Sequence, residues 1–272
     1  MMLKFSKRKK LIVSGCSYTD NYAATQNLEP FKLWPELLAE KLDMDCINLA
    51  KCGFGNKAIY TTLTERIINE KNIGLVIPMW TEFQRVSFLM PNSKGEDTWV
   101  CFLPERTILE ADWQDKFFKP PKKNTKKLES RYIISRFFRN NKMDNLGAAV
   151  SESLNYMYAL QTICKSQWIP HLQIQGTHPI MSKNSKIGKQ QDKDLSNHII
   201  DSCFIDRIER NFIGWPIVGN IGGYSANSIM KDNHRIGDVY YAGGGALDSH
   251  PNMLGHALIS EVLYDEYQKI YA

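Results

Sequence analysis

Short apolar runs alternate along the chain with segments in which apolar residues recur every three or four positions. Short runs bounded by turn residues are typical of buried strands, and the longer spacing is typical of amphipathic helices. Strands that alternate with helices form parallel sheets, so we expect an α/β fold. The expected strands cover residues 11–15, 46–50, 73–80 and 169–175.

The segments with helical spacing lie between and after these strands. In the first of them, apolar positions 34, 37, 38 and 42 share one face, and Pro35 is tolerated there only within a first turn. Such helices would be the crossovers that connect parallel strands. The expected helices cover about residues 33–42, 56–70, 145–167, 198–211 and 253–271.

Two long stretches interrupt the alternation. Residues 87–142 lack sustained periodicity, apart from a short hairpin expected around residues 99–102 and one helix, and residues 176–236 include a polar, loop-like stretch at 181–197. Long insertions in α/β domains are often lids or contact surfaces. With 272 residues and 43% hydrophobic content, residues 1–272 are expected to form one domain that carries both insertions.

The net charge of +5 is concentrated in residues 119–142, which hold nine basic residues against one acid, Glu129. We expect this segment at the surface, because so many cations cannot be buried without acidic partners. Its role is open: it is either a solvated loop or a contact for another protein or an anionic glycan. The basic residues are Lys119, Lys122, Lys123, Lys126, Lys127, Arg131, Arg136, Arg139 and Lys142.

The remaining composition argues against several kinds of site. The six cysteines show no Cys-x-x-Cys spacing and the histidines no metal-ligand spacing, so we expect reduced thiols, no metal and no cofactor. No apolar run approaches the roughly 18 residues of a membrane span, and the basic start is followed by a strand too short for a secretory signal. We therefore expect no membrane span and a cytoplasmic location.

Candidate catalytic residues stand near the two ends of the chain. Ser17 follows the first expected strand, at the sheet edge where ligands of α/β proteins bind, and Asp248 and His250 precede the last expected helix. A serine hydroxyl is a poor nucleophile until a histidine accepts its proton, and a carboxylate then orients the ring. We therefore expect Ser17 to be the nucleophile, His250 the base and Asp248 the orienting acid.

Three blocks around these residues carry a resemblance to a known family. The blocks are Gly15-Cys16-Ser17-Tyr18-Thr19, Asn48-Leu49-Ala50-Lys51-Cys52-Gly53 and Asp248-Ser249-His250-Pro251-Asn252. They resemble the first, second and last sequence blocks of the SGNH hydrolase (GDSL-type esterase) superfamily, and about residues 85–235 are unmatched. The resemblance implies a three-layer α/β sandwich with a parallel five-stranded sheet in the order 2-1-3-4-5. It also implies an oxyanion site formed by the backbone N–H groups of Ser17 and Gly53.

The chain departs from the superfamily pattern in two places. The third block usually carries Gly-x-Asn-Asp, whose asparagine helps to bind the oxyanion, whereas this chain has Met79-Trp80-Thr81-Glu82. Thr81 stands where the asparagine would be, and its hydroxyl is a candidate third donor with a shorter reach. The acid usually lies three residues before the histidine, and here the gap from Asp248 to His250 is two.

The favoured function is serine-dependent hydrolysis of esters, with acetyl groups on a carbohydrate as one candidate substrate. The alternative is a protein of the same fold with little catalysis, such as a phage structural or glycan-binding protein. A looser resemblance of Gly214-Trp215-Pro216, paired with Asp-x-His-Pro, to tailed-phage proteins favours such an origin and a virion-associated location. The candidate substrate contacts are Asn56, Trp80 and Trp215; Asn56 could equally cap a helix, and the Trp215 segment could equally be a structural turn.

Overall fold

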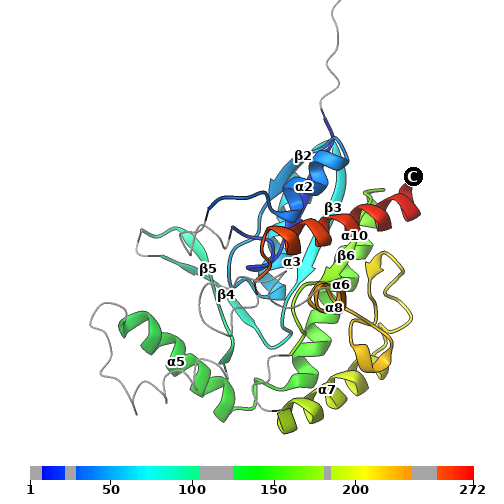
Figure 1. Cartoon of the computed structure of the whole chain (residues 1–272). Helices are drawn as coiled ribbons and strands as arrows, with labels where there is room; N and C mark the ends of the chain where they lie inside the picture. Colours follow the sequence, from blue (N-terminus) through cyan, green and yellow to red (C-terminus); the bar gives the residue numbers. More distant parts are fainter. Residues whose placement is uncertain (1–7, 22–28, 93, 105–124, 181–184, 234–249) are drawn as a thin grey trace, which may run out of the picture.

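The computed structural model describes residues 8–21, 29–92, 94–104, 125–180, 185–233 and 250–272 (Figure 1). Within these residues, a five-stranded sheet has the order β2-β1-β3-β6-β7, and each neighbouring pair is parallel. Counted along the chain within this sheet, the order is 2-1-3-4-5, so the predicted fold class and strand order are confirmed. The strands are β1 (Lys10–Ser14), β2 (Asp45–Asn48), β3 (Ile73–Trp80), β6 (Gln173–Gln175) and β7 (Phe212–Ile213).

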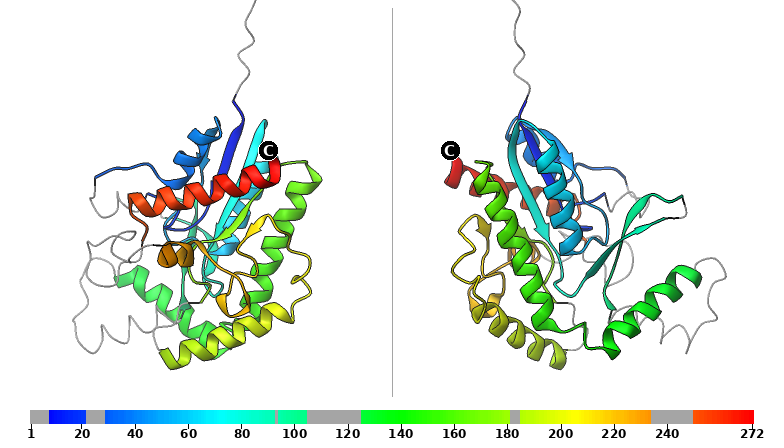
Figure 2. Two further views of the ribbon diagram at one scale, coloured as in Figure 1. Left: turned by 45° about the vertical axis from the view of Figure 1, so that its right-hand side comes forward. Right: turned by 180° about the vertical axis from the view of Figure 1, so that it is seen from behind.

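Helices cover both faces of the sheet, which gives three layers (Figure 2). Alternate residues of β1 enter the two cores: Ile12 packs on the side of α3 (Asn56–Asn69) and α6 (Leu146–Ser166), whereas Leu11 and Val13 pack on the side of α2 (Trp34–Lys41) and α10 (Met253–Tyr271). A strand covered on both faces needs a continuous apolar run. That requirement explains why the run at the start of the chain predicted its position well.

Within its described residues, the first insertion contains an antiparallel hairpin and a helix, where the sequence predicted a short hairpin around residues 99–102 and one helix. The hairpin consists of β4 (Val86–Pro91) and β5 (Asp97–Phe102), and the helix is α5 (Thr125–Asn140). Figures 1 and 2 show α5 at the edge of the molecule. The ring of Phe138 on α5 meets the ring of Phe88 on β4, with centroids 5.9 Å apart.

The basic segment is only partly described. Arg136, Arg139 and Lys142 are exposed and Arg131 is half-buried, which agrees with the predicted surface position for these four residues. Lys119, Lys122 and Lys123 lie outside the described residues, and the structure gives only the backbone of Lys126 and Lys127. A contact with a protein or an anionic glycan through this segment stays a prediction.

The second insertion differs from the prediction. Helix α7 runs from Ser185 to Ile200, where a polar loop was expected, and turns follow it where a helix was expected. The apolar residues Leu195 and Ile199 are fully buried at helical spacing, and they anchor an otherwise polar helix against α6. Helix α8 (Ala226–Asn233) follows. Among the described helices, none is long and apolar enough to cross a membrane.

A buried histidine links α10 to the start of α2. The first N–H groups of a helix lack partners within the helix, and Nδ1 of His256 accepts the backbone N–H of Trp34 at 3.2 Å. His256 is 1% exposed, and burial lowers its pKa from 6.5 to about 4. The ring is therefore neutral at neutral pH, as an acceptor must be.

This contact predicts a pH-dependent stability. A pKa that is lower in the folded than in the unfolded chain gives stability that is present above pH 6.5 and is lost as the pH falls toward about 4. When the pH falls from 7 to 5, this histidine should lower the free energy of unfolding by roughly 2 kcal/mol. His256→Asn keeps an acceptor oxygen that does not titrate, so urea denaturation should show a smaller loss in this variant than in the wild type. Equal losses in both proteins would show that His256 is not the titrating group.

Candidate active site

The turn after β1 is tight because it begins at a glycine. The N–H groups of Thr19 and Asp20 both bind the carbonyl of Cys16, each at 3.0 Å. A Cβ on Gly15 would lie 2.8 Å from Cβ of Thr19, closer than real side chains approach. Only glycine therefore lets the chain turn back here, and the turn carries Ser17 at the carboxyl end of the strand.

Neighbouring elements hold the Ser17 turn from outside. The indole N–H of Trp34 donates to the carbonyl of Tyr18 at 3.1 Å, and the amide of Asn48 donates to the carbonyl of Thr19 at 2.7 Å. Two carbonyl groups of the turn are therefore already hydrogen-bonded. The N–H of Ser17 itself has no acceptor among the described residues.

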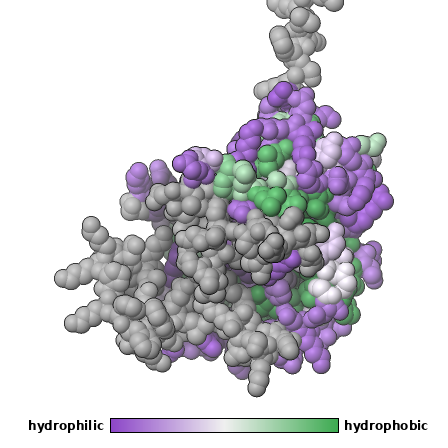
Figure 3. All heavy atoms as spheres, viewed as in Figure 1, coloured by the Kyte–Doolittle hydropathy of each residue, from purple (hydrophilic) through white to green (hydrophobic). Residues whose placement is uncertain are grey.

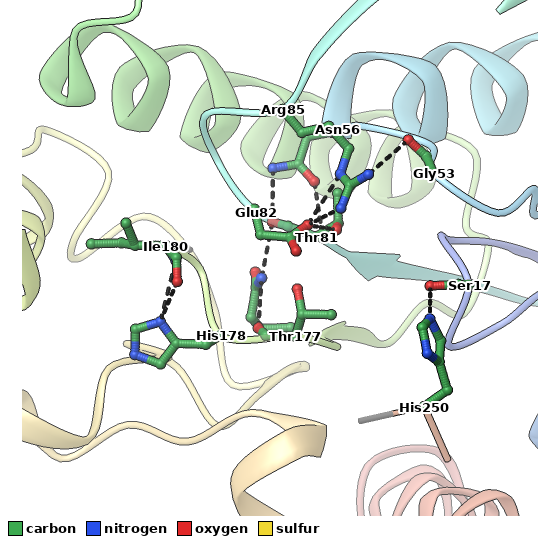
Figure 4. Close-up of polar contacts among 11 residues, drawn as sticks. Ser17, Gly53, Asn56, Thr81, Glu82, Arg85, Thr177, His178, Ile180 and His250 are labelled. Atoms are coloured by element: carbon green, nitrogen blue, oxygen red, sulfur yellow. Dashed lines mark hydrogen bonds and ion pairs between the residues drawn. The ribbon is translucent and has the colours of Figure 1, made fainter. Parts of the chain in front are cut away.

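The last part of the chain brings His250 to Ser17. Nε2 of His250 lies 2.9 Å from Oγ of Ser17 (Figure 4). The histidine ring also meets the ring of Tyr18 edge-on, with centroids 5.9 Å apart. Asn252 fixes the chain just beyond the histidine, because its side chain caps α10 by accepting the N–H of Gly255 at 3.0 Å. The contact expected between residues 233 positions apart is therefore present. Asp248 lies outside the described residues, and its role stays a prediction.

A second turn, after β2, is joined to the first. The N–H of Cys52 donates to the carboxylate of Asp20 at 2.7 Å, and the N–H of Lys51 lies 3.3 Å from the carbonyl of Gly15. Two N–H groups of the second turn thus donate to acceptors in the first turn. These bonds place Gly53 beside the Ser17 turn.

Gly53 has the backbone of a type II turn. The N–H of Phe54 donates to the carbonyl of Lys51 at 3.0 Å, and Gly53 has φ +88° at the third position, where this turn type requires a positive φ. The N–H of Gly53 has no acceptor in the part of the chain that the structure describes. Unpaired N–H groups on two linked turns are what an oxyanion site requires.

Thr81 does not fit its predicted role as an oxyanion donor. It is fully buried, its N–H donates to Oδ1 of Asn56 at 2.9 Å, and its hydroxyl donates to the carboxylate of Glu82. A threonine has only these two donors. Both are therefore engaged, and the prediction for Thr81 is corrected.

Two predicted substrate contacts are core residues instead. Asn56 is 2% exposed, and its amide donates to the carbonyl of Thr81 at 3.3 Å and to Oγ of Ser153 at 3.0 Å. Trp80 is fully buried, with its indole N–H donating to Gln173 at 2.9 Å. Neither side chain is free to meet a substrate. Asn56 is also the first residue of α3, and the structure shows no side-chain cap there.

Trp215 is half-buried and is held by packing. Its indole N–H donates to the carbonyl of Ile205 at 3.1 Å, and its ring lies 5.3 Å from the ring of Phe212. A substrate contact through its exposed part stays a prediction.

An ion pair that was not predicted from the sequence lies next to this site. The half-buried Arg85 forms an ion pair with the buried Glu82, with Nη2 of Arg85 2.7 Å from Oε2 of Glu82 (Figure 4). Burial disfavours both charges, but each partner outweighs that effect, so the pKa of Glu82 is lowered and the pKa of Arg85 is raised. Both groups are therefore ionised. The signal for them was available: opposite charges three residues apart directly follow a buried strand.

Cys52 is a further neighbour of Ser17. Burial raises the pKa of its thiol, and the charges of Cys16 and Asp20 raise it further, against the opposing effects of Arg85 and of a hydrogen bond with Ser17. A neutral thiol is a weak nucleophile, so Ser17 is the better candidate. Among the described residues, no group of three or more histidine, cysteine or acidic side chains could hold a metal ion.

The sequence matches no protein-family model and no curated protein. Solved structures that it resembles include an acetylxylan esterase, Axe2, from Geobacillus stearothermophilus, with 10% identity, 96% of this chain and 94% of that chain covered, and a TM-score of 0.47. A member of the lipolytic G-D-S-L family from Veillonella parvula has 11% identity, 97% and 98% coverage and a TM-score of 0.42. An esterase, EstA, from a Pseudoalteromonas species has 12% identity, 96% and 97% coverage and a TM-score of 0.43.

The placement of Asn56 gives a prediction that separates a core role from substrate binding. Asn56→Ala leaves the buried N–H of Thr81 without its acceptor, and each unsatisfied buried group costs about 1–3 kcal/mol. Urea denaturation should therefore show a clear loss of unfolding free energy. Asn155→Ala, on the exposed face of α6, is the control and should change little. If Asn56→Ala were as stable as the wild type, Asn56 would again be a candidate substrate contact.

Proposed function

We propose that this protein is a serine-dependent hydrolase of short acyl esters. The observation that carries the proposal is the 2.9 Å contact between Oγ of Ser17 and Nε2 of His250, next to the unpaired N–H groups of Ser17 and Gly53. A nucleophile within hydrogen-bond reach of a base, beside two unpaired donors on neighbouring turns, is the arrangement that acyl transfer needs.

Each group has a definite part in the reaction. His250 takes the proton of the Ser17 hydroxyl as Oγ attacks the ester carbonyl, and the N–H groups of Ser17 and Gly53 bind the negative oxygen that forms. The imidazolium then protonates the leaving alcohol, which leaves the acyl group on Ser17. Water attacks this ester with His250 again as base, and the carboxylic acid and the free serine result. Asp248 would orient the ring, as the sequence predicts.

A carbohydrate is the alcohol that we propose for the ester. A cavity of about 490 Å³ adjoins the Gly53 turn at Lys51 and has Phe54 and Trp99 in its lining. Aromatic faces beside hydrogen-bonding side chains suit a sugar ring, which has both apolar and hydroxyl surfaces. The polar residues of the lining are Asn48, Lys51, Thr62, Glu65, Arg66 and Asn69.

One observation favours the second candidate, a glycan-binding protein with weak catalysis. Both donors of Thr81 are engaged elsewhere, so β3 supplies no side-chain donor at the position where the superfamily has its asparagine. Losing one donor typically costs about 10²–10³ in kcat. The same cavity could then bind an acylated glycan that is turned over slowly.

Covalent labelling distinguishes the two candidates. A fluorophosphonate should add once to the wild-type protein in intact-mass measurements, because it reacts only with an activated serine. Ser17→Ala and His250→Ala should block the labelling and hydrolysis of p-nitrophenyl acetate, and Ser151→Ala, at an exposed position on α6, should change neither. Turnover that is equal in wild type and Ser17→Ala would reject the hydrolase.

The Gly53 N–H can be tested with a pair of glycine variants. Gly53 and Gly95 both have positive φ, +88° and +78°, and an added Cβ meets no atom closer than 3.9 Å at either position. Substitution by alanine should therefore lower the free energy of unfolding by a similar amount at both positions, about 1–2 kcal/mol. Alanine keeps the backbone N–H but disfavours the positive φ that directs it, so only Gly53→Ala should lower kcat for ester hydrolysis, by up to about a hundredfold. Equal kcat values for both variants would exclude the Gly53 turn from the oxyanion site.

A further inference from the structure

The largely buried ion pair of Glu82 and Arg85, which follows β3, contacts the Gly53 turn. Arg85 directs Nε and Nη2 to the same oxygen of Glu82, at 3.1 and 2.7 Å, and its Nη1 donates to the carbonyl of Gly53 at 3.2 Å (Figure 4). The side chains of Glu82 and Arg85 are only 7% and 15% exposed. The carbonyl of Gly53 is therefore tied, through one arginine, to a carboxylate fixed at the end of the central strand.

This hydrogen bond restrains Gly53, the residue of the site with the greatest backbone freedom. Glycine adopts positive and negative φ almost equally well, so its conformation is set by its contacts. The neighbours of Gly53 are held through the N–H groups of Cys52 and Phe54, whereas Gly53 is held only through its carbonyl among the described residues. The bond from Arg85 thus helps to fix the direction of the unpaired N–H of the same residue.

An arginine is suited to this task and a lysine is not. The planar guanidinium offers donors in fixed directions, so it can bind a carboxylate with one edge and a carbonyl with another. An ammonium group can neutralise Glu82, but it is a compact charge with no such fork. The two demands can therefore be separated by substitution.

We propose that Arg85 is a positioning residue of the oxyanion site, which holds the Gly53 turn so that the N–H of Gly53 meets the transition state. The proposal rests on the proposed function. Through Arg85, the segment after β3 would then contribute to the oxyanion site although it lacks the asparagine of the superfamily. Thr81 and Glu82 fix Arg85, Arg85 fixes Gly53, and Gly53 supplies the donor.

The test uses Arg85→Lys, which keeps the positive charge beside Glu82. Its matched control is Arg8→Lys, at the exposed ion pair with Asp43 just before β1. With p-nitrophenyl acetate, and with kcat expressed per fluorophosphonate-reactive site, Arg85→Lys should lower kcat about ten- to a hundredfold and change KM less than threefold, because the lost interaction acts in the transition state. Arg8→Lys should change neither constant.

A second readout does not depend on turnover. Hydrogen–deuterium exchange of residues 51–54 should be faster in Arg85→Lys than in the wild type, because the turn loses the hydrogen bond from Arg85. Exchange of the same residues should be unchanged in Arg8→Lys. The proposal would be overturned if Arg85→Lys matched the wild type both in exchange and in kcat per reactive site. It would also be overturned if a smaller folded fraction explained the whole loss of activity in this variant. If the wild type itself shows no Ser17-dependent turnover, the proposed function fails, and unchanged exchange would then reject the positioning role as well.

Discussion

The parallel pairing of β1 with β2 and β3 is the constraint on which the site depends. Val13 pairs with Asn48 on one side, and Ser14 pairs with Pro78 on the other, so all three strands end at one edge. Carboxyl ends of parallel strands meet there, and their turns can bond to one another. The bonds from Cys52 to Asp20 and from Arg85 to the Gly53 turn exist only because this register aligns the strand ends.

On the face that Figure 3 shows, apolar residues are visible near the position of α2 and α10, whereas polar residues dominate much of the described surface. Burial against the sheet holds α10 in place through Ile259 and Leu263, and α10 in turn places His250 beside Ser17. The histidine and the serine are joined across most of the chain, and packing of the last helix supplies the energy that loop closure requires.

Periodicity and strand-end motifs could be predicted from sequence because they are local. The apolar run of β1 and the serine after it are visible as a pattern, and so is the histidine before a helix cap. The roles of Thr81 and Asn56, and the bond from Arg85 to Gly53, could not be predicted, because they depend on which groups across strand ends become hydrogen-bond partners. Trp80 was misjudged for a related reason: a tryptophan at a strand end is equally consistent with the core and with a pocket wall.

A crystal structure of the fluorophosphonate adduct would show which groups bind the oxyanion. Phosphorus should be bonded to Oγ of Ser17, with one phosphoryl oxygen about 2.7–3.1 Å from the N–H groups of both Ser17 and Gly53. Arg85 should still donate to the carbonyl of Gly53. An adduct on another residue, or a phosphoryl oxygen bound by Thr81 and turned away from Gly53, would rule out the proposed oxyanion site.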